Sequence, residues 1–318
     1  MTTNDTRTRK LIEISYMYYI DGMSQNQIAK EYSISRSMVS MMLNEARAKG
    51  IVKIEIKDSG DLYCFDLQRK LERIFGIKKA IVIPMLSKDI KNNITQLADA
   101  AVNYLTQIID NNMIIAVSWG RTVYEIANRM KPNGKTNLTI SPLVGGIGNE
   151  MNIYHANVIS DTMSKRLGAV SLGLYAPVFV STKEVRDIIF KDKSIKKVLE
   201  TSQNADIAIV GIGSIVSSTM EDIGVLEKED ICDLKDNGII GDISTCFFDK
   251  NGQSVENNMF SDRTVALSIE ELEKIPNIIA VAGGKKKVEA IHGALKGKLM
   301  DVLVTDEEVA KEILKKYE

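Results

Sequence analysis

Four short segments of the sequence combine glycine with groups that can hold an anion. In the first, SWGRT at 118–122, Ser118, Gly120 and Thr122 offer backbone amides and a hydroxyl. Arg121 adds a guanidinium, which pairs well with phosphate. The other segments are 145–148, 211–214 and 283–287, the last with three consecutive lysines. Where such a segment opens a helix, unpaired amides and a partial positive charge point at the anion. Together the segments favour a phosphorylated small molecule.

Each segment has an alternative reading. Glycine between a strand and a helix often serves backbone geometry rather than a ligand. The glycines that we take as ligand contacts are Gly145, Gly146, Gly211 and Gly213. Neither Gly146-Ile147-Gly148 nor Gly211-Ile212-Gly213 continues into a complete GxGxxG motif, because Met151 and Val216 occupy the position of the last glycine. The chain also has no Walker motif. Dinucleotide or ATP binding is therefore a minor alternative, and no cofactor is predicted.

Asp242 is a candidate for contacts with sugar hydroxyls. It follows the apolar pair Ile239 and Ile240 and then Gly241. A carboxylate accepts hydrogen bonds from hydroxyls, but an aspartate at a strand end is equally common as a turn former. Lysines 285–287 are also open to two readings, because a run of charges can be a solvated helix face.

Composition excludes several classes of protein. The 318 residues hold 41 basic and 42 acidic side chains, and 44% are apolar, as in an ordinary globular protein. Three cysteines without a CxxC spacing and only two histidines argue against a disulfide framework, a metal site or a histidine-based triad. The apolar runs are too short to span a bilayer. We expect a cytoplasmic protein.

The pattern of the chain changes near residue 58. Residues 1–57 hold nine Lys/Arg and six Asp/Glu, a net charge of plus three, and are mostly helical in pattern. Beyond a turn-like linker at 58–61, residues 62–318 alternate apolar β-branched runs with amphipathic helices, which is typical of a mostly parallel sheet in a Rossmann-like α/β domain. The predicted strands lie near 80–83, 113–117, 138–143, 207–210, 278–282 and 302–305.

The first 57 residues read as a helix-turn-helix. Leu11, Ile14 and Tyr18 share one helical face before Gly22. Ser24 with Gln27 predicts a capping box that opens a second helix. Ser35 can cap a third helix, whose inward positions are Val39, Met42, Leu43 and Ala46. Alternation from Val52 to Lys57 predicts a strand, or wing.

The outward face of the third helix is polar and slim, which suits the major groove of DNA. The predicted DNA contacts are Gln25, Ser35, Arg36, Ser37, Ser40, Met41, Asn44 and Arg47. The alternative is a packing module with a solvated face. Because a charge of plus three is modest, one copy would bind weakly, and we expect a multimer that presents several modules.

The segment YYIDGMSQNQIAKEYSISRSMVSMMLNEARAKGIVKIEI resembles the DNA-binding part of the SorC family of bacterial transcription regulators. Family-like segments continue through most of the chain: SWGRT, PLVGGIG, ADIAIVGIGS, GDI, FFDKNG and AGGKKKVEAIHGALKGKLMDVLVTDEEVA. One position departs from the family, whose members often carry a basic residue where this chain has Met41.

The resemblance implies a sugar-binding effector domain that is similar to sugar-phosphate isomerases, in a homo-oligomer, commonly a tetramer. The GGxxK pattern selects Lys287 as the lysine that faces the ligand, and the HAN pattern adds Asn157. The implied function is a repressor-like transcription regulator whose affinity for operator DNA depends on a phosphorylated sugar. The competing class is an active phosphosugar isomerase, but no carboxylate pair has an enforced spacing and histidine is scarce.

Overall fold

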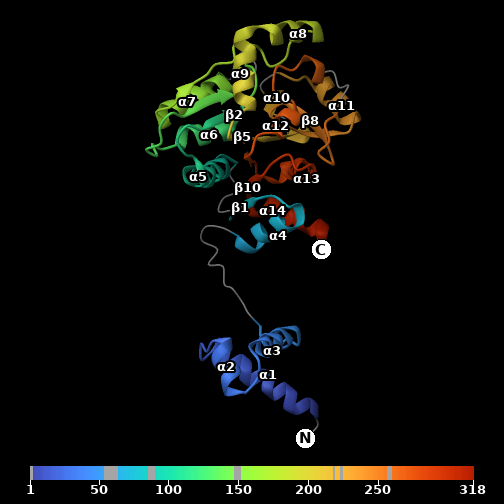
Figure 1. The fold of residues 1–318 in the computed structure, drawn as a ribbon. Helices are drawn as coiled ribbons and strands as arrows, with labels where there is room; N and C mark the ends of the chain where they lie inside the picture. Colours follow the sequence, from blue (N-terminus) through green and yellow to red (C-terminus); the bar gives the residue numbers. More distant parts are fainter. Residues whose placement is uncertain are drawn as a thin grey trace. The chain divides into compact units, whose positions relative to one another are not determined.

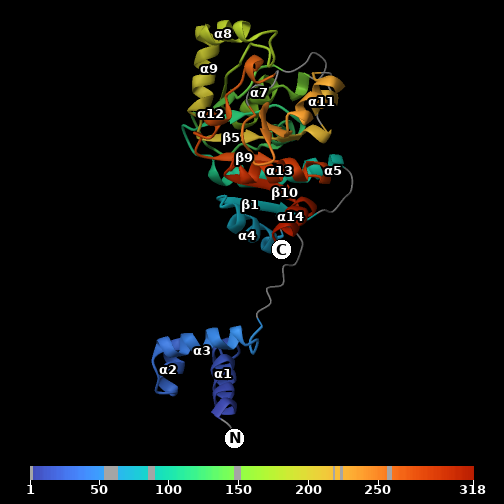
Figure 2. The same cartoon turned by 90° about the vertical axis from the view of Figure 1, so that its right-hand side faces the viewer.

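The structure is a computed structural model that describes residues 3–53, 64–84, 90–146, 152–217, 219–222, 225–255 and 260–318. The chain divides into two compact units, Met1–Asp58 and Ser59–Glu318. Figure 1 shows the ribbon of both, and Figure 2 shows it turned by 90°. The predicted linker at 58–61 lies outside the described residues.

The first unit consists of three helices, α1 (Thr3–Tyr19), α2 (Gln25–Glu31) and α3 (Arg36–Ala48). Ser24 and Gln27 form the predicted capping box, and the Ser35 hydroxyl accepts the Met38 N–H at 3.2 Å. Of the positions predicted to face inward, six are buried in one core together with Ile28: Leu11, Ile14, Val39, Met42, Leu43 and Ala46. Tyr18, on the same predicted face as Leu11 and Ile14, is partly buried against this core. The three helices are thus confirmed. The wing expected from Val52 lies, from residue 54 onward, outside the described residues.

The second unit contains a seven-stranded parallel sheet of order β1-β10-β9-β5-β2-β3-β4. Its strands are β1 (Lys79–Ile83), β2 (Ile114–Val117), β3 (Thr139–Pro142), β4 (Val170–Ser171), β5 (Ile207–Val210), β9 (Ile278–Val281) and β10 (Val302–Asp306). Six of them lie where apolar β-branched runs predict strands. The exception is β4, a two-residue edge strand with exposed side chains, which carries no such run.

The described part of the second unit also contains eleven helices, not all of which pack on this sheet. They are α4 (Phe65–Phe75), α5 (Ile90–Ile108), α6 (Arg121–Arg129), α7 (Ala156–Leu167), α8 (Lys183–Lys191), α9 (Lys193–Gln203), α10 (Thr219–Asp222), α11 (Lys228–Asp236), α12 (Ile269–Leu272), α13 (Val288–Lys296) and α14 (Glu307–Leu314). Short 3-10 turns are η1 (Asn152–Tyr154), η2 (Ile215–Ser217), η3 (Ser261–Arg263), η4 (Lys285–Lys287) and η5 (Lys315–Tyr317).

Alternation along the strands divides the core into two layers. On β9, Ile279 and Val281 pack with α5, α6 and α7, whereas Ile278 and Ala280 pack with α4, α9, α13 and α14. Figure 1 shows α5, α6 and α7 together on one side of the strands and α13 on the other. This is the predicted α/β architecture. It brings the carboxyl ends of β2, β5 and β9 to one edge of the sheet, where open α/β sheets bind ligands.

A second, three-stranded antiparallel sheet was not predicted. It consists of β6 (Ile212–Ser214), β7 (Ile239–Ile243) and β8 (Cys246–Asp249), in the order β6-β7-β8. Two expectations were therefore wrong. Gly213 lies in a strand rather than in a strand-to-helix turn, and Asp242 lies inside a strand rather than at its end. Glycine and aspartate have low strand propensity, so the sequence of these strands lacks the alternation of apolar and polar residues that predicts a strand.

Candidate effector site and DNA-binding face

The loop after β2 leads into the first turn of α6. Gly120 caps this helix with φ of +117° and ψ of 162°, a conformation that essentially only glycine adopts. Its N–H donates to the Tyr154 carbonyl at 3.0 Å, and the N–H of Ser118 donates to Ile209. Arg121 and Thr122 follow as the first residues of α6, where helix amides lack partners within the helix. An anion at this end therefore meets the amides of the first turn rather than those of Ser118 and Gly120.

Asp242 is held inside the small sheet. The pairing of β6 with β7 sets Gly213 directly opposite Asp242, and a Cβ at position 213 would lie 1.8 Å from Oδ1 of the carboxylate. The Asp242 side chain is 8% exposed, and its Oδ2 accepts the Thr245 N–H at 3.2 Å. Burial raises the pKa of Asp242 to about 6, although the Thr245 N–H and the nearby Lys287 oppose the shift. Glycine at 213 is thus present to make room for a carboxylate.

Lys287 is the last residue of η4 and directly precedes α13. Its Nζ donates to the Ile212 carbonyl at 2.7 Å. Burial lowers the pKa of Lys287, the Asp242 carboxylate raises it and the Arg121 guanidinium lowers it. The Asp242 carboxylate and the Arg121 guanidinium therefore each act electrostatically on the Lys287 ammonium. The predicted selection of Lys287 agrees with this placement, since Lys285 and Lys286 are exposed.

The arrangement can hold a phosphorylated polyol. Two cations and the first turn of α6 suit an anionic group, and a buried carboxylate suits hydroxyl groups. Within the described residues, no three His, Cys, Asp or Glu side chains gather as a metal site.

The paired glycines after β3 do not serve an anion through their amides. The Gly145 N–H donates to Val265 and the Gly146 N–H to Ala176. A Cβ on Gly145 would lie 2.6 Å from the Ala176 carbonyl oxygen, so the residue is glycine because another backbone segment passes close by. The rest of that loop, 147–150, lies outside the described residues. Gly211 follows β5 and has open space around its Cα.

Asn157 was predicted to contact the ligand, and its side chain is instead engaged by backbone. Its Nδ2 donates to the Leu174 carbonyl at 3.0 Å, and its Oδ1 accepts the Leu174 N–H at 2.8 Å. The carboxamide therefore ties the start of α7 to the segment that follows β4. We leave Asn157 out of the proposed ligand contacts.

Sequence reasoning missed Asp306, which explains the glycine pair after β9. The fully buried Asp306 carboxylate accepts the Gly284 N–H at 2.6 Å and the Val309 N–H at 2.9 Å. A Cβ on Gly283 would lie 2.4 Å from Asp306 Oδ2. Its only signal in the sequence is an aspartate at the start of a helix, the N-cap position of α14.

The third helix carries the predicted DNA-binding face. Its outward residues are exposed or half-buried, as is Gln25 at the start of α2: Ser35, Arg36, Ser37, Ser40, Met41, Asn44 and Arg47. Neither Arg36 nor Arg47 forms an ion pair among the residues that the structure describes. The acid of this helix, Glu45, is neutralised from the side by Arg7 at 2.7 Å and Lys49 at 2.8 Å, and these hydrogen bonds lower its pKa to about 2. No pattern in the sequence indicates this ion pair between α1 and α3.

No helix in the described part of the chain is long and apolar enough to cross a lipid bilayer.

Comparison with known proteins agrees with this division into a helical unit and a ligand-binding unit. Residues 62–315 match the family described as "Putative sugar-binding domain". The chain is 31% identical to the deoxyribonucleoside regulator of Bacillus subtilis over 306 residues, which cover 95% of this chain and 96% of the relative. It is 28% identical to the sorbitol operon regulator of Klebsiella pneumoniae over 315 residues, which cover 98% and 99% of the two chains.

Solved structures give the same picture. The full-length sorbitol operon regulator SorC from Klebsiella pneumoniae superposes with a TM-score of 0.73 at 27% identity, covering 96% of this chain and 98% of that one. A DeoR family transcriptional regulator from Listeria monocytogenes also gives 0.73, at 36% identity, over 79% of this chain and 99% of that one. These relatives are named as regulators and not as enzymes, which decides against the isomerase alternative. With its sugar-binding segment and its full-length match, the chain belongs to the SorC family of sugar-binding transcription regulators.

Proposed function

We propose that this regulator binds operator DNA through α3 and a phosphorylated sugar through Arg121, Thr122, Asp242 and Lys287, and that the sugar phosphate changes its affinity for DNA. The observation that carries the proposal is the meeting of a buried carboxylate and a cation at β6: Asp242 faces Gly213, and the Lys287 ammonium donates to the carbonyl of the preceding residue, Ile212. A bound phosphate also fits the half-buried position of Lys287, because a partly desolvated ammonium gains from a charged partner. The protein acts in the cytoplasm, where its operator DNA is.

The ligand-binding residues have distinct tasks. The amides of the first turn of α6, with the Thr122 hydroxyl and the Arg121 guanidinium, receive the phosphate. Lys287 supplies a second positive charge. Asp242 accepts hydrogen bonds from sugar hydroxyls and so distinguishes a sugar phosphate from a simple anion.

On the DNA side, Arg36 and Arg47 contact phosphates or guanine, and Asn44 and Ser40 face base edges. Because affinity for duplex rests largely on neutralised phosphates, one module binds weakly. The regulator therefore acts as a homo-oligomer, a dimer or a tetramer, that presents several copies of α3. The sugar phosphate must bind one arrangement of subunits better than another, and operator DNA must then change the affinity for the sugar phosphate by the same factor.

Thermal unfolding and DNA binding test the proposal together. A panel of pentose and hexose phosphates is compared with the same sugars without phosphate. At least one phosphate should raise the midpoint of unfolding where its free sugar does not, and should shift affinity for the promoter of the protein's own gene by about 5- to 150-fold.

Two lysine variants test whether Lys287 is required for the response to the sugar phosphate. Lys287→Ala should lose the response to the phosphate while keeping DNA binding without effector, and Lys286→Ala, at the exposed neighbouring position, should keep both. Stabilisation that survives in Lys287→Ala, or steady formation of product that Asp242→Asn abolishes, would overturn the proposal.

A further inference from the structure

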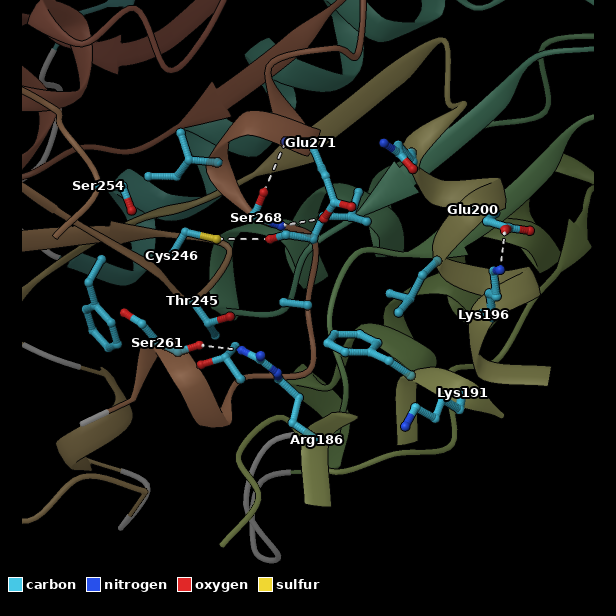
Figure 3. A pocket seen from close by; sticks show the side chains of 18 residues that line it. Arg186, Lys191, Lys196, Glu200, Thr245, Cys246, Ser254, Ser261, Ser268 and Glu271 are labelled. Carbon is cyan, nitrogen blue, oxygen red and sulfur yellow. Dashed lines mark hydrogen bonds and ion pairs between the residues drawn. The ribbon is translucent and has the colours of Figure 1, made fainter. Parts of the chain in front are cut away.

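A cavity of about 820 Å³ lies between α8 and α9 on one side and β8 and residues 260–271 on the other. Figure 3 shows it from close by. None of the residues assigned above to the effector site lines it. Its volume is within the range of roughly 300–1,000 Å³ that is usual for small-molecule sites.

The lining divides into an apolar wall and a polar rim. The wall contains Phe190, Leu199, Phe247, Leu267 and Ile269. The rim carries hydroxyls from serine and threonine residues of several elements. An apolar wall with a few convergent polar groups is the usual form of a site for an organic molecule.

The charges in the lining favour an anion. Glu271 is used at the start of α12, where it accepts the Ser268 N–H at 2.9 Å, and Glu200 lies 3.7 Å from Lys196. Lys191 has no ion-pair partner among the residues that the structure describes, and no dashed line reaches it in Figure 3. Lys191 is therefore the lining cation that no carboxylate in the described part of the chain pairs.

Arg186 and Cys246 also line the cavity, and both side chains have partners in the protein. The Arg186 side chain is 20% exposed and forms ion pairs with Asp187 at 3.1 Å and Asp262 at 3.8 Å. It also donates to the Ser261 carbonyl at 3.3 Å and packs over the Phe190 ring at 5.7 Å. Figure 3 shows it reaching from α8 toward Ser261 and Thr245. The Cys246 thiol donates to the Leu267 carbonyl at 3.0 Å, and burial raises its pKa to about 12. A neutral thiol is a poor nucleophile, so we do not assign a reaction to Cys246.

We propose that this cavity is a second ligand site, which takes an organic anion with an apolar ring body: the ring packs on the Phe190 and Phe247 side, and the anionic group meets Lys191 and Arg186. The site adjoins the effector site through one residue. Thr245 lines the cavity, and its N–H holds the Asp242 carboxylate. An occupant that moves Thr245 changes the support of Asp242, so this second ligand modulates the response to the first. The site goes beyond the proposed function, which stands if the site does not exist.

Isothermal titration of the full-length protein with 1-naphthyl phosphate, 1-naphthol and inorganic phosphate tests the site. The cavity should bind naphthyl phosphate about tenfold or more tighter than either fragment, because ring and charge are both recognised. Lys191→Ala should weaken it about tenfold. Lys197→Ala, at an exposed position of α9 that does not line the cavity, should leave the affinity unchanged.

Two further variants separate this site from the effector site. Ala266→Leu places extra volume in the lining and should abolish binding of naphthyl phosphate. A cooperative unfolding transition verifies that this variant folds. If the variant does not fold, Phe190→Ala replaces it in the experiment. Lys287→Ala should leave naphthyl phosphate binding unchanged. The proposal is overturned if naphthyl phosphate does not bind, if it binds Lys191→Ala as tightly as the natural protein, or if Lys287→Ala and not Lys191→Ala removes the binding.

Discussion

Gly213 lies directly opposite Asp242 in the antiparallel pair of β6 and β7, and the carboxylate occupies the space that a side chain at 213 would need. One residue is small so that the other can be charged and buried. The small sheet therefore positions Asp242 in the proposed effector site, and Gly213 contributes by leaving space for the carboxylate.

Gly213→Ala should destabilise the second unit by about 1–3 kcal/mol, because the added methyl group displaces the Asp242 carboxylate. Urea unfolding measures the change. Gly211→Ala, two residues earlier and with open space around it, is the control and should change stability by less than about 0.5 kcal/mol. In an Asp242→Ala background the cost of Gly213→Ala should largely disappear; an equal cost there would contradict the steric explanation.

The pH dependence of stability should reflect Asp242. Its pKa is raised in the folded protein to about 6, above the ordinary value of 3.8, so the folded state holds this proton more tightly than the unfolded state. Stability from this group is present at low pH and is lost as pH rises through about 6, by roughly 3 kcal/mol in all. Asp242→Asn should therefore be more stable than the natural protein at pH 7.5, with the difference shrinking toward pH 4. Urea midpoints at both pH values check this, and a constant difference would refute it.

Asn157→Ala should cost about 1–3 kcal/mol of stability, because the N–H and C=O of Leu174 lose their partners. The affinity for the sugar phosphate should stay within about twofold, since the carboxamide is committed to backbone. Unfolding and titration separate the two effects. A large loss of affinity with unchanged stability would restore Asn157 to the ligand contacts.

Met41→Arg should strengthen DNA binding. Met41 is 49% exposed on the predicted recognition face, and an arginine there can neutralise one more phosphate. The slope of log affinity against log salt should steepen by about one unit. Ile12→Arg adds the same charge at an exposed position of α1 and should not change the slope. Equal effects from both variants would mean that only overall charge matters.

Arg36→Ala and Ser40→Ala should each weaken DNA binding, and Arg36→Ala should also reduce the salt slope by about one unit. Fluorescence anisotropy across a salt series measures both. DNA binding that is unchanged in the two variants would rule out α3 as the recognition helix.

Local signals were sufficient for the helices of the first unit and the strands of the large sheet. Ser24 and Ser35 cap their helices through contacts within three residues, and the buried strands carry β-branched runs that need no tertiary information. The family resemblance supplied the choice of Lys287, which spacing alone left open.

The rest depends on contacts between distant residues. The glycine at 283 is explained by Asp306, and the amide of Asn157 by Leu174. Gly241 is glycine because its Cα passes close to the Gly213 carbonyl, where a Cβ would lie 2.6 Å from the oxygen. A sequence shows that such glycines exist but not which partner requires them, so several were assigned to the ligand when they serve packing.

The hydrogen bond from Lys287 to the Ile212 carbonyl has a consequence for selectivity. The ammonium already has a backbone oxygen as partner, so an incoming anion must offer more than that oxygen does. Chloride and other weakly bonding ions of the cell gain too little by the exchange, whereas a doubly charged group with several oxygens gains enough. We therefore expect the proposed site to respond to a phosphorylated ligand and not to the common ions of the cell.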